Sequence, residues 1–161
     1  MTLIANRRSV IIGLGLSTLP SFAWAEATTH VVEMLNRHPD DKKKRNVFLP
    51  LIQVVEPGDT VTFKSVDRGH NSEAIEGMIP DGTEMWKSKV SKDVSVTLQQ
   101  PGVYGYKCTP HYALGMVGLV IVKGEGMAAN LEAAKAVKQR GKARQAFEEI
   151  WAQIESENLL S

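Results

Sequence analysis

Three side chains that can bind a soft metal ion lie within nine residues of one another in this sequence. Cys108, His111 and Met116 form the pattern C-x2-H-x4-M, and Cys108 is the only cysteine among 161 residues. A thiolate, an imidazole and a thioether together can bind a transition metal, while a thiol beside an imidazole can act as a nucleophile. The pattern by itself leaves a metal site, a catalytic thiol and an ordinary turn as alternatives.

A fourth donor lies earlier, in the sequence DRGHNSE, where His70 follows a glycine. Two imidazoles, a thiolate and a weak axial thioether are the ligands of blue-copper electron-transfer sites. Structural zinc sites use four strong ligands, and a cysteine nucleophile leaves His70 and Met116 without a role. The four donors together therefore favour copper. The other two histidines, His30 and His38, are expected to be ordinary strand and loop residues.

The first 25 residues have the layout of a secretory signal peptide. Arg7 and Arg8 precede an apolar run at 10–19, and the sequence AWA at 23–25 places small residues around an expected cleavage point. The arginine pair also permits twin-arginine export. The chain is therefore expected in the periplasm. An unpaired cysteine is unusual in such an oxidising compartment, and a metal bound to its thiolate explains it.

Length and charge exclude several classes of protein. Cleavage leaves 136 residues, the size of one domain. Removing Arg7 and Arg8 from a chain with 19 basic and 18 acidic residues leaves a net charge of −1 with neutral histidines. A nearly neutral chain is not expected to bind nucleic acid. No second long apolar segment follows, so no membrane anchor is expected.

Short strand patterns separated by turns occupy the chain from about residue 29 to residue 123. Apolar and polar residues alternate at 29–35, 60–64 and 94–98, and the region 47–55 is apolar around Pro50. The pattern predicts a mainly β fold, a Greek-key sandwich with antiparallel pairing. His70 and Cys108 each come shortly after a predicted strand.

The end of the chain changes to helical patterns. Asn130 is expected to cap a helix containing Leu131, Ala134 and Val137. A second helix is expected to place these apolar residues on one face: Ala143, Phe147, Ile150, Trp151 and Ile154. We expect both helices to pack on the sandwich, although they can also form a partner-binding surface. The expected divisions are a signal peptide at 1–25, a sandwich at 26–124 and a helical extension at 125–161.

The order of these motifs resembles the pseudoazurin family of bacterial periplasmic cupredoxins. The resemblance is carried by HVVEMLN, EPGDTVTF, DRGHNSEAIEGMIPDG, WKSKV, PGVYGYKCTPHY and GMVGLVIV, and by the helical tail. It implies one type 1 copper ion, cycling between Cu(I) and Cu(II), that is bound by His70, Cys108, His111 and Met116. It also implies reversible electron transfer, not enzymatic turnover. A periplasmic copper carrier without redox cycling is the alternative function.

Two residues next to the ligands are expected to tune the site. Asn71 is expected to join the two ligand loops and to donate its backbone N–H toward the Cys108 sulfur, with a plain turn residue as the alternative. Pro110 has no N–H and so withholds one donor from that sulfur.

The electron is expected to leave through His111, within a small apolar patch. Its expected members are Pro50, Pro80, Pro110, Ala113 and Leu114. The resemblance places these basic residues around the patch: Lys64, Arg68, Lys87, Lys89 and Lys107. Arg37 and the run Lys42–Arg45 are further candidates for this ring. A basic ring steers an acidic partner, and a merely solvated surface is the alternative. The resemblance implies nitrite reductase, other denitrification enzymes or c-type cytochromes as partners, and a monomer is expected.

Overall fold

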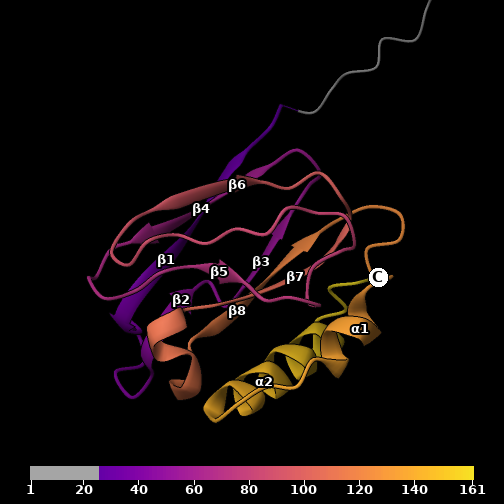
Figure 1. Ribbon diagram of the computed structural model, residues 1–161. Helices are drawn as coiled ribbons and strands as arrows, with labels where there is room; N and C mark the ends of the chain where they lie inside the picture. Colours follow the sequence, from indigo (N-terminus) through magenta and orange to yellow (C-terminus); the bar gives the residue numbers. More distant parts are fainter. Residues whose placement is uncertain (1–25) are drawn as a thin grey trace, which may run out of the picture.

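The computed structural model describes residues 26–161, and the expected signal peptide lies outside the described residues. Within this range eight strands form two four-stranded sheets, and two C-terminal helices lie beside the second sheet (Figure 1). The first sheet has the order β2 (Arg45–Leu49), β1 (Thr29–Arg37), β4 (Thr60–Ser65), β6 (Val94–Thr97). The second has the order β3 (Ile52–Val55), β8 (Val117–Val122), β7 (Gly102–Lys107), β5 (Glu73–Ala74). The β-sandwich prediction is confirmed.

Strand pairing is mixed, so the expectation of antiparallel pairing is only partly correct. Strands β1 and β4 run parallel, as do β3 and β8, while the other pairs are antiparallel. The apolar run at 47–55 is divided at Pro50, with β2 in the first sheet and β3 in the second. Because the chain changes sheets there, strands that are not consecutive become neighbours, and a longer connection allows them to be parallel.

An aromatic cluster fills the space between the sheets near the site. The ring of Tyr106 lies 4.8 Å from Phe48 and 4.7 Å from Phe63, measured between centroids, and Phe63 stacks on Trp86. These rings are buried, and large buried aromatic side chains contribute strongly to core stability. Gly118 lies directly against the Tyr106 hydroxyl, where any side chain would collide with it.

The helices α1 (Leu131–Ala136) and α2 (Lys142–Ser156) pack on the second sheet, as expected. The buried face of α2 consists of Ala143, Phe147, Ile150 and Ile154. All six residues of β8 are buried, because its two faces contact the sandwich core and the helices. Asn130 does not cap α1 with its side chain; its amide instead binds the backbone N–H and C=O of Val103 in β7.

The sandwich brings the two ligand segments to one end. His70 follows β4 in chain order, Cys108 directly follows β7, and the 3-10 helix η1 (Thr109–Leu114) leads from Cys108 to β8. No helix in residues 26–161 combines the length and the apolar character needed to cross a membrane.

Candidate metal centre

Three of the four predicted donors converge on one point. The ligand atoms of His70, Cys108 and His111 all lie within 4.8 Å of one another. The two histidine Nδ1 atoms are 3.1 Å apart, and Cys108 Sγ lies 3.7 Å from Nδ1 of His70 and 3.5 Å from Nδ1 of His111. His70 and Cys108 are fully buried, whereas His111 is partly exposed. The site therefore has a closed interior and one ligand at the surface.

The hydrogen bond between Nε2 of His70 and Asn36 indicates which nitrogen of the His70 ring can bind a metal. His70 Nε2 lies 2.9 Å from Oδ1 of Asn36, which can only accept, so Nε2 carries the proton. In the neutral ring Nδ1 then presents a lone pair, and it faces the His111 Nδ1 and the Cys108 sulfur. Without a metal, only the Cys108 thiol proton or a ring proton of His111 can be shared among these three atoms, whereas one cation between them can bind all three. A copper ion fits this donor set, because imidazoles and a thiolate are its preferred ligands in blue-copper sites.

The ionisation of the buried donors agrees with a metal site more than with a catalytic thiol. Burial raises the pKa of the Cys108 thiol, and hydrogen bonds from the backbone N–H groups of Asn71 and His111 offset this only in part. Nucleophilic cysteines show the opposite shift, toward a lower pKa. Burial, followed by the neighbouring His111, lowers the pKa of His70 and keeps its ring in the neutral form that binds metals.

Met116 is buried, and the backbone holds it beside the other two loop donors. The N–H of Cys108 donates to the carbonyl of Met116 at 3.0 Å, and the N–H of Met116 donates to the carbonyl of His111 at 3.2 Å. Gly115 ends η1 with φ of 93°, a left-handed conformation that favours glycine. Backbone hydrogen bonds thus join the two ends of the ligand loop. The assignment of Met116 as the fourth ligand stays a prediction.

Asn71 joins the two ligand loops through its side chain. Its Oδ1 accepts the backbone N–H of Thr109 at 2.7 Å, and its Nδ2 donates to Oγ1 of Thr109 and to the carbonyl of Ser88. Its own backbone N–H bonds the Cys108 sulfur. Pro110 lies exposed at the start of η1, where it offers no N–H. Both residues are therefore placed to affect the sulfur.

Sequence reasoning did not find Asn36. It lies in β1, 34 residues before His70, in a strand whose pattern indicates only alternating burial. Residues that hold the second nitrogen of a ligand histidine set the orientation of its ring. No local spacing links the two residues, since the contact depends on the pairing of β1 with β4.

The predicted docking residues are mostly exposed, and an acidic residue not predicted lies among them. Leu114 is 56% exposed, and Lys64, Arg68 and Lys89 are exposed. Glu73 pairs with two lysines: its carboxylate lies 3.1 Å from Nζ of Lys87 and 3.9 Å from Nζ of Lys107.

The carboxylate of Glu73 also accepts a hydrogen bond from the Thr109 hydroxyl. Burial alone would raise the pKa of Glu73, but hydrogen bonds from Thr109 and Lys87 bring it below its ordinary value. Glu73 is therefore an anion, and it partly neutralises Lys87 and Lys107.

Pro80 does not belong to the apolar patch around His111. It is buried beside Gly102, at the start of β7, while Cys108 follows the other end of that strand. The prediction was wrong because spacing along the chain did not show where the segment after β5 crosses the sandwich. Pro110, Ala113 and Leu114 remain as exposed apolar residues near His111, and Pro50 is partly exposed.

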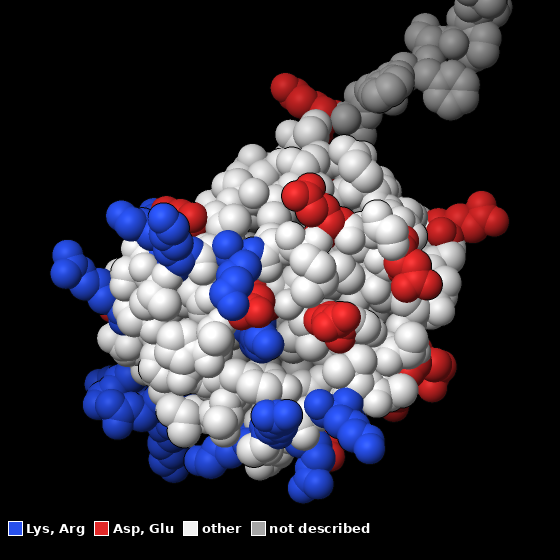
Figure 2. Space-filling view, viewed as in Figure 1, with Lys and Arg blue, Asp and Glu red and all other residues white. Residues whose placement is uncertain are grey.

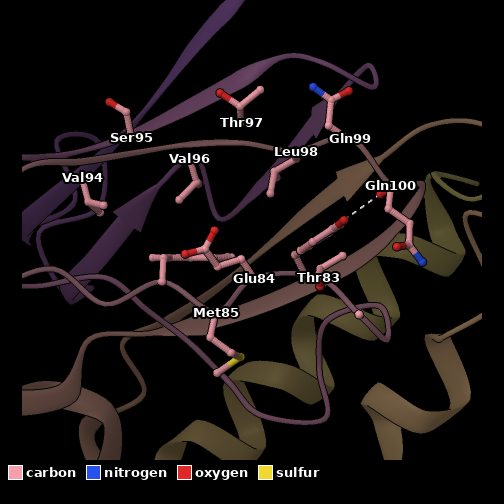
Figure 3. Close-up of a pocket in the computed structure, with 13 residues that line it drawn as sticks. Thr83, Glu84, Met85, Val94, Ser95, Val96, Thr97, Leu98, Gln99 and Gln100 are labelled. Atoms are coloured by element: carbon pink, nitrogen blue, oxygen red, sulfur yellow. Dashed lines mark hydrogen bonds between the residues drawn. The ribbon is translucent and has the colours of Figure 1, made fainter.

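Charge is distributed unevenly over the surface. Figure 2 shows Lys and Arg gathered on the side where η1 and the β1–β2 loop lie in Figure 1, with most Asp and Glu of this face on the other side. A separate hollow of about 670 Å³ lies between β6 and residues 82–86 (Figure 3). None of the predicted ligand or docking residues lines that hollow.

Comparisons with known proteins agree with the site. Residues 38–123 match the model of the family described as copper binding proteins, plastocyanin/azurin family. A pseudoazurin of Paracoccus pantotrophus is 44% identical over 80% of this chain and 85% of its own length. The crystal structure of pseudoazurin from Methylobacterium extorquens AM1 has a TM-score of 0.72 and 41% identity, covering 78% of this chain and 98% of that one.

A third relative, the native pseudoazurin of Hyphomicrobium denitrificans, has a TM-score of 0.70 at 36% identity, over 78% of this chain and 97% of its own. The likeness to these two structures thus extends over more than three quarters of this chain and nearly all of each relative. The chain belongs to the pseudoazurin family of copper-binding cupredoxins and is a blue-copper electron-transfer protein.

Proposed function

We propose that this chain is a periplasmic shuttle that moves single electrons between redox proteins, and that His70, Cys108, His111 and Met116 hold its copper ion. The observation that carries the ligand assignment is the convergence of the two Nδ1 atoms and Sγ within 4.8 Å. The division into a signal peptide at 1–25, a sandwich at 26–124 and a helical extension at 125–161 belongs to this proposal, as does a monomeric state.

The surrounding residues favour electron transfer without substrate turnover. When bound, copper supplies a one-electron couple, with soft sulfur ligands suiting Cu(I) and imidazoles suiting Cu(II). The sandwich holds the donors in fixed positions: Asn36 orients His70, and Asn71 ties the loop of Cys108 to that of His70. Little rearrangement is then needed when the charge changes. His111 is the partly exposed ligand, so we place the electron exit there.

The surface charge supports an acidic partner, of which nitrite reductases and c-type cytochromes are the proposed examples. A basic side of the molecule next to an exposed apolar residue, Leu114, attracts a negatively charged surface and then contacts it closely. The local distribution matters here, because the whole chain is nearly neutral.

Reversal of the charge of Arg68, which forms no ion pair within residues 26–161, tests the steering. Arg68→Glu should slow the bimolecular reduction of an acidic partner roughly three- to tenfold at low salt and have little effect at high salt. Arg68 suits this test better than Lys87 or Lys107, whose charges Glu73 already offsets. The control is Lys123→Glu, at the end of β8 that is distant from Met116, made together with Glu56→Gln because Glu56 pairs with Lys123 at 3.3 Å. Stopped-flow rates at several ionic strengths measure both. Equal slowing by the two variants, or slowing that ignores salt, would refute the steering proposal.

A further inference from the structure

A groove between β2 and α2 leads away from the ligand loop. Its volume is about 470 Å³, and Leu114 and Gly115 form the end nearest the copper ligands. Leu49, Leu51 and Val117 contribute apolar surface to it, and residues of α2 form one wall. We call this feature the β2–α2 groove. Lys64, Arg68, Lys87, Lys89 and Lys107 do not line it. Lys43, Lys44 and Arg45 do, and they belong to the run expected to add to the basic ring.

The charges along the β2–α2 groove are mainly positive and uncompensated. Four basic residues line it, namely Lys43, Lys44, Arg45 and Lys142, against one acidic residue, Glu149. Within residues 26–161 none of the four basic residues forms an ion pair, in contrast to Lys87 and Lys107, which share Glu73. A concave surface with charges of one sign over apolar walls concentrates the potential that a ligand experiences.

The position of Leu114 connects this groove to the electron exit. Leu114 is 56% exposed, lines the groove and lies three residues after His111 on η1. A protein that docks over His111 can therefore contact the groove at Leu114 in the same docked position. The carboxylates of a partner match the basic residues, and an apolar partner side chain matches the floor formed by Leu49, Leu51 and Val117.

We propose that the β2–α2 groove binds an extended acidic segment of the redox partner, containing at least one apolar residue, while the partner docks at His111. This rests on the proposed shuttle function and adds a second contact to it. The segment slows dissociation of the complex and leaves the electron-transfer step at copper unchanged. Removing groove charges therefore weakens binding of the partner without changing the site.

The direct test uses two short peptides added to the ¹⁵N-labelled Cu(I) protein. The first is acetyl-Glu-Glu-Leu-Glu-Glu-amide, and the second replaces its leucine with glycine. NMR should show amide shifts at Arg45, Lys142 and Ala146, with the leucine peptide binding several times more tightly. Arg45→Gln with Lys142→Gln should raise the dissociation constant roughly tenfold.

The matched control is Arg37→Gln with Arg140→Gln. Arg37 faces Arg45 across β1 and β2, Arg140 is two residues before Lys142, and neither lines the groove or forms an ion pair within residues 26–161. The control should bind the leucine peptide as the parent does. Shifts confined to Arg68 and Lys89, equal loss of binding in both double variants, or identical shifts with inorganic phosphate would overturn the groove proposal.

One further measurement separates this proposal from the shuttle function. Both double variants should keep the visible copper band and the parent rate of electron transfer to a small inorganic complex. If the copper-loaded parent protein shows no visible band, the proposed shuttle function is contradicted. If the peptide binds outside the groove, only the docking proposal is contradicted.

Discussion

Two polar clusters lie at opposite ends of strand β4, and they differ in the partners that their polar atoms contact. At the start of the strand, the Asp59 carboxylate accepts the backbone N–H of Thr28 at 2.8 Å and of Glu56 at 3.0 Å, and lies 2.7 Å from Nε2 of His30. Beyond the other end, His70, Cys108 and His111 direct their donor atoms at one another.

The difference distinguishes a polar cluster that stabilises the fold from one that binds an ion. Around Asp59 each acceptor has a hydrogen donor, so the cluster fastens β1 to the turn before β4 and needs nothing more. In the ligand cluster Nε2 of His70 contacts Asn36, so its Nδ1 is left to face the Cys108 sulfur and the His111 Nδ1, as a metal ligand does. Substitutions at the two clusters should therefore have different consequences, which the following predictions compare.

The largest effect is expected from loss of a ligand. Cys108→Ala and His70→Ala should each reduce tightly bound copper from about one ion per chain to nearly none, because a donor that converges on the ion is removed. His30→Ala should keep the ion. Copper content after dialysis against a chelator measures this. A His70→Ala protein that retains its copper would show that the convergence has another cause.

The next largest effect is expected at Asn36, which orients His70. Asn36→Ala should weaken copper binding about 10- to 100-fold, the usual cost of losing a residue that positions a metal ligand. Asp59→Asn, in the other cluster, should change the affinity less than twofold. Competition with a Cu(I) chelator gives both dissociation constants, and similar losses in the two variants would mean that general destabilisation is responsible.

A smaller effect is expected at the sulfur. Pro110→Ala introduces an N–H near Cys108, and a hydrogen bond to the thiolate favours the reduced form, which carries less positive charge on the metal. A gain of about 1 kcal/mol corresponds to roughly 40 mV for one electron, so the reduction potential should rise by about that amount. Voltammetry measures it, with Pro57→Ala, in the turn before β4, as the control. An unchanged or lower potential would contradict this role.

The smallest effect appears only in acid and concerns Asp59. Hydrogen bonds from Thr28, Glu56 and His30, in that order, lower its pKa from 3.8 to about 2. Because the folded state has the lower pKa, the stabilisation is complete above about pH 4 and is lost as pH falls toward 2.

Urea unfolding of the copper-free protein between pH 6 and pH 2 should show this loss. Asp59→Asn should be less stable at pH 6 and show a shallower decline of stability in acid. An equally steep decline in the variant would assign the acid sensitivity to other carboxylates.

The sequence allowed prediction of features that depend on local pattern. Alternation in β1 and β4, the helical face of α2 and the closely spaced donors on η1 all follow from neighbouring residues. His70, on the other ligand segment, could also be predicted, because it comes shortly after a strand as Cys108 does.

Contacts between distant segments were not predictable in the same way. Asn36 reaches His70 only because β1 lies parallel to β4, and that pairing results from the change of sheet at Pro50. Asn130 has the residue type of a helix cap, yet its amide satisfies backbone groups of Val103 at the edge of β7, since β5 is only two residues long.

The absorption spectrum of the oxidised, copper-loaded protein tests the ligand assignment most directly. A thiolate bound to Cu(II) between two imidazoles, with a weak axial thioether, gives an intense visible charge-transfer band. We predict this band at one copper per chain, and its absence in Cys108→Ala. A copper-loaded protein without colour, or a band that persists in Cys108→Ala, would contradict the assignment of His70, Cys108, His111 and Met116 as the copper ligands.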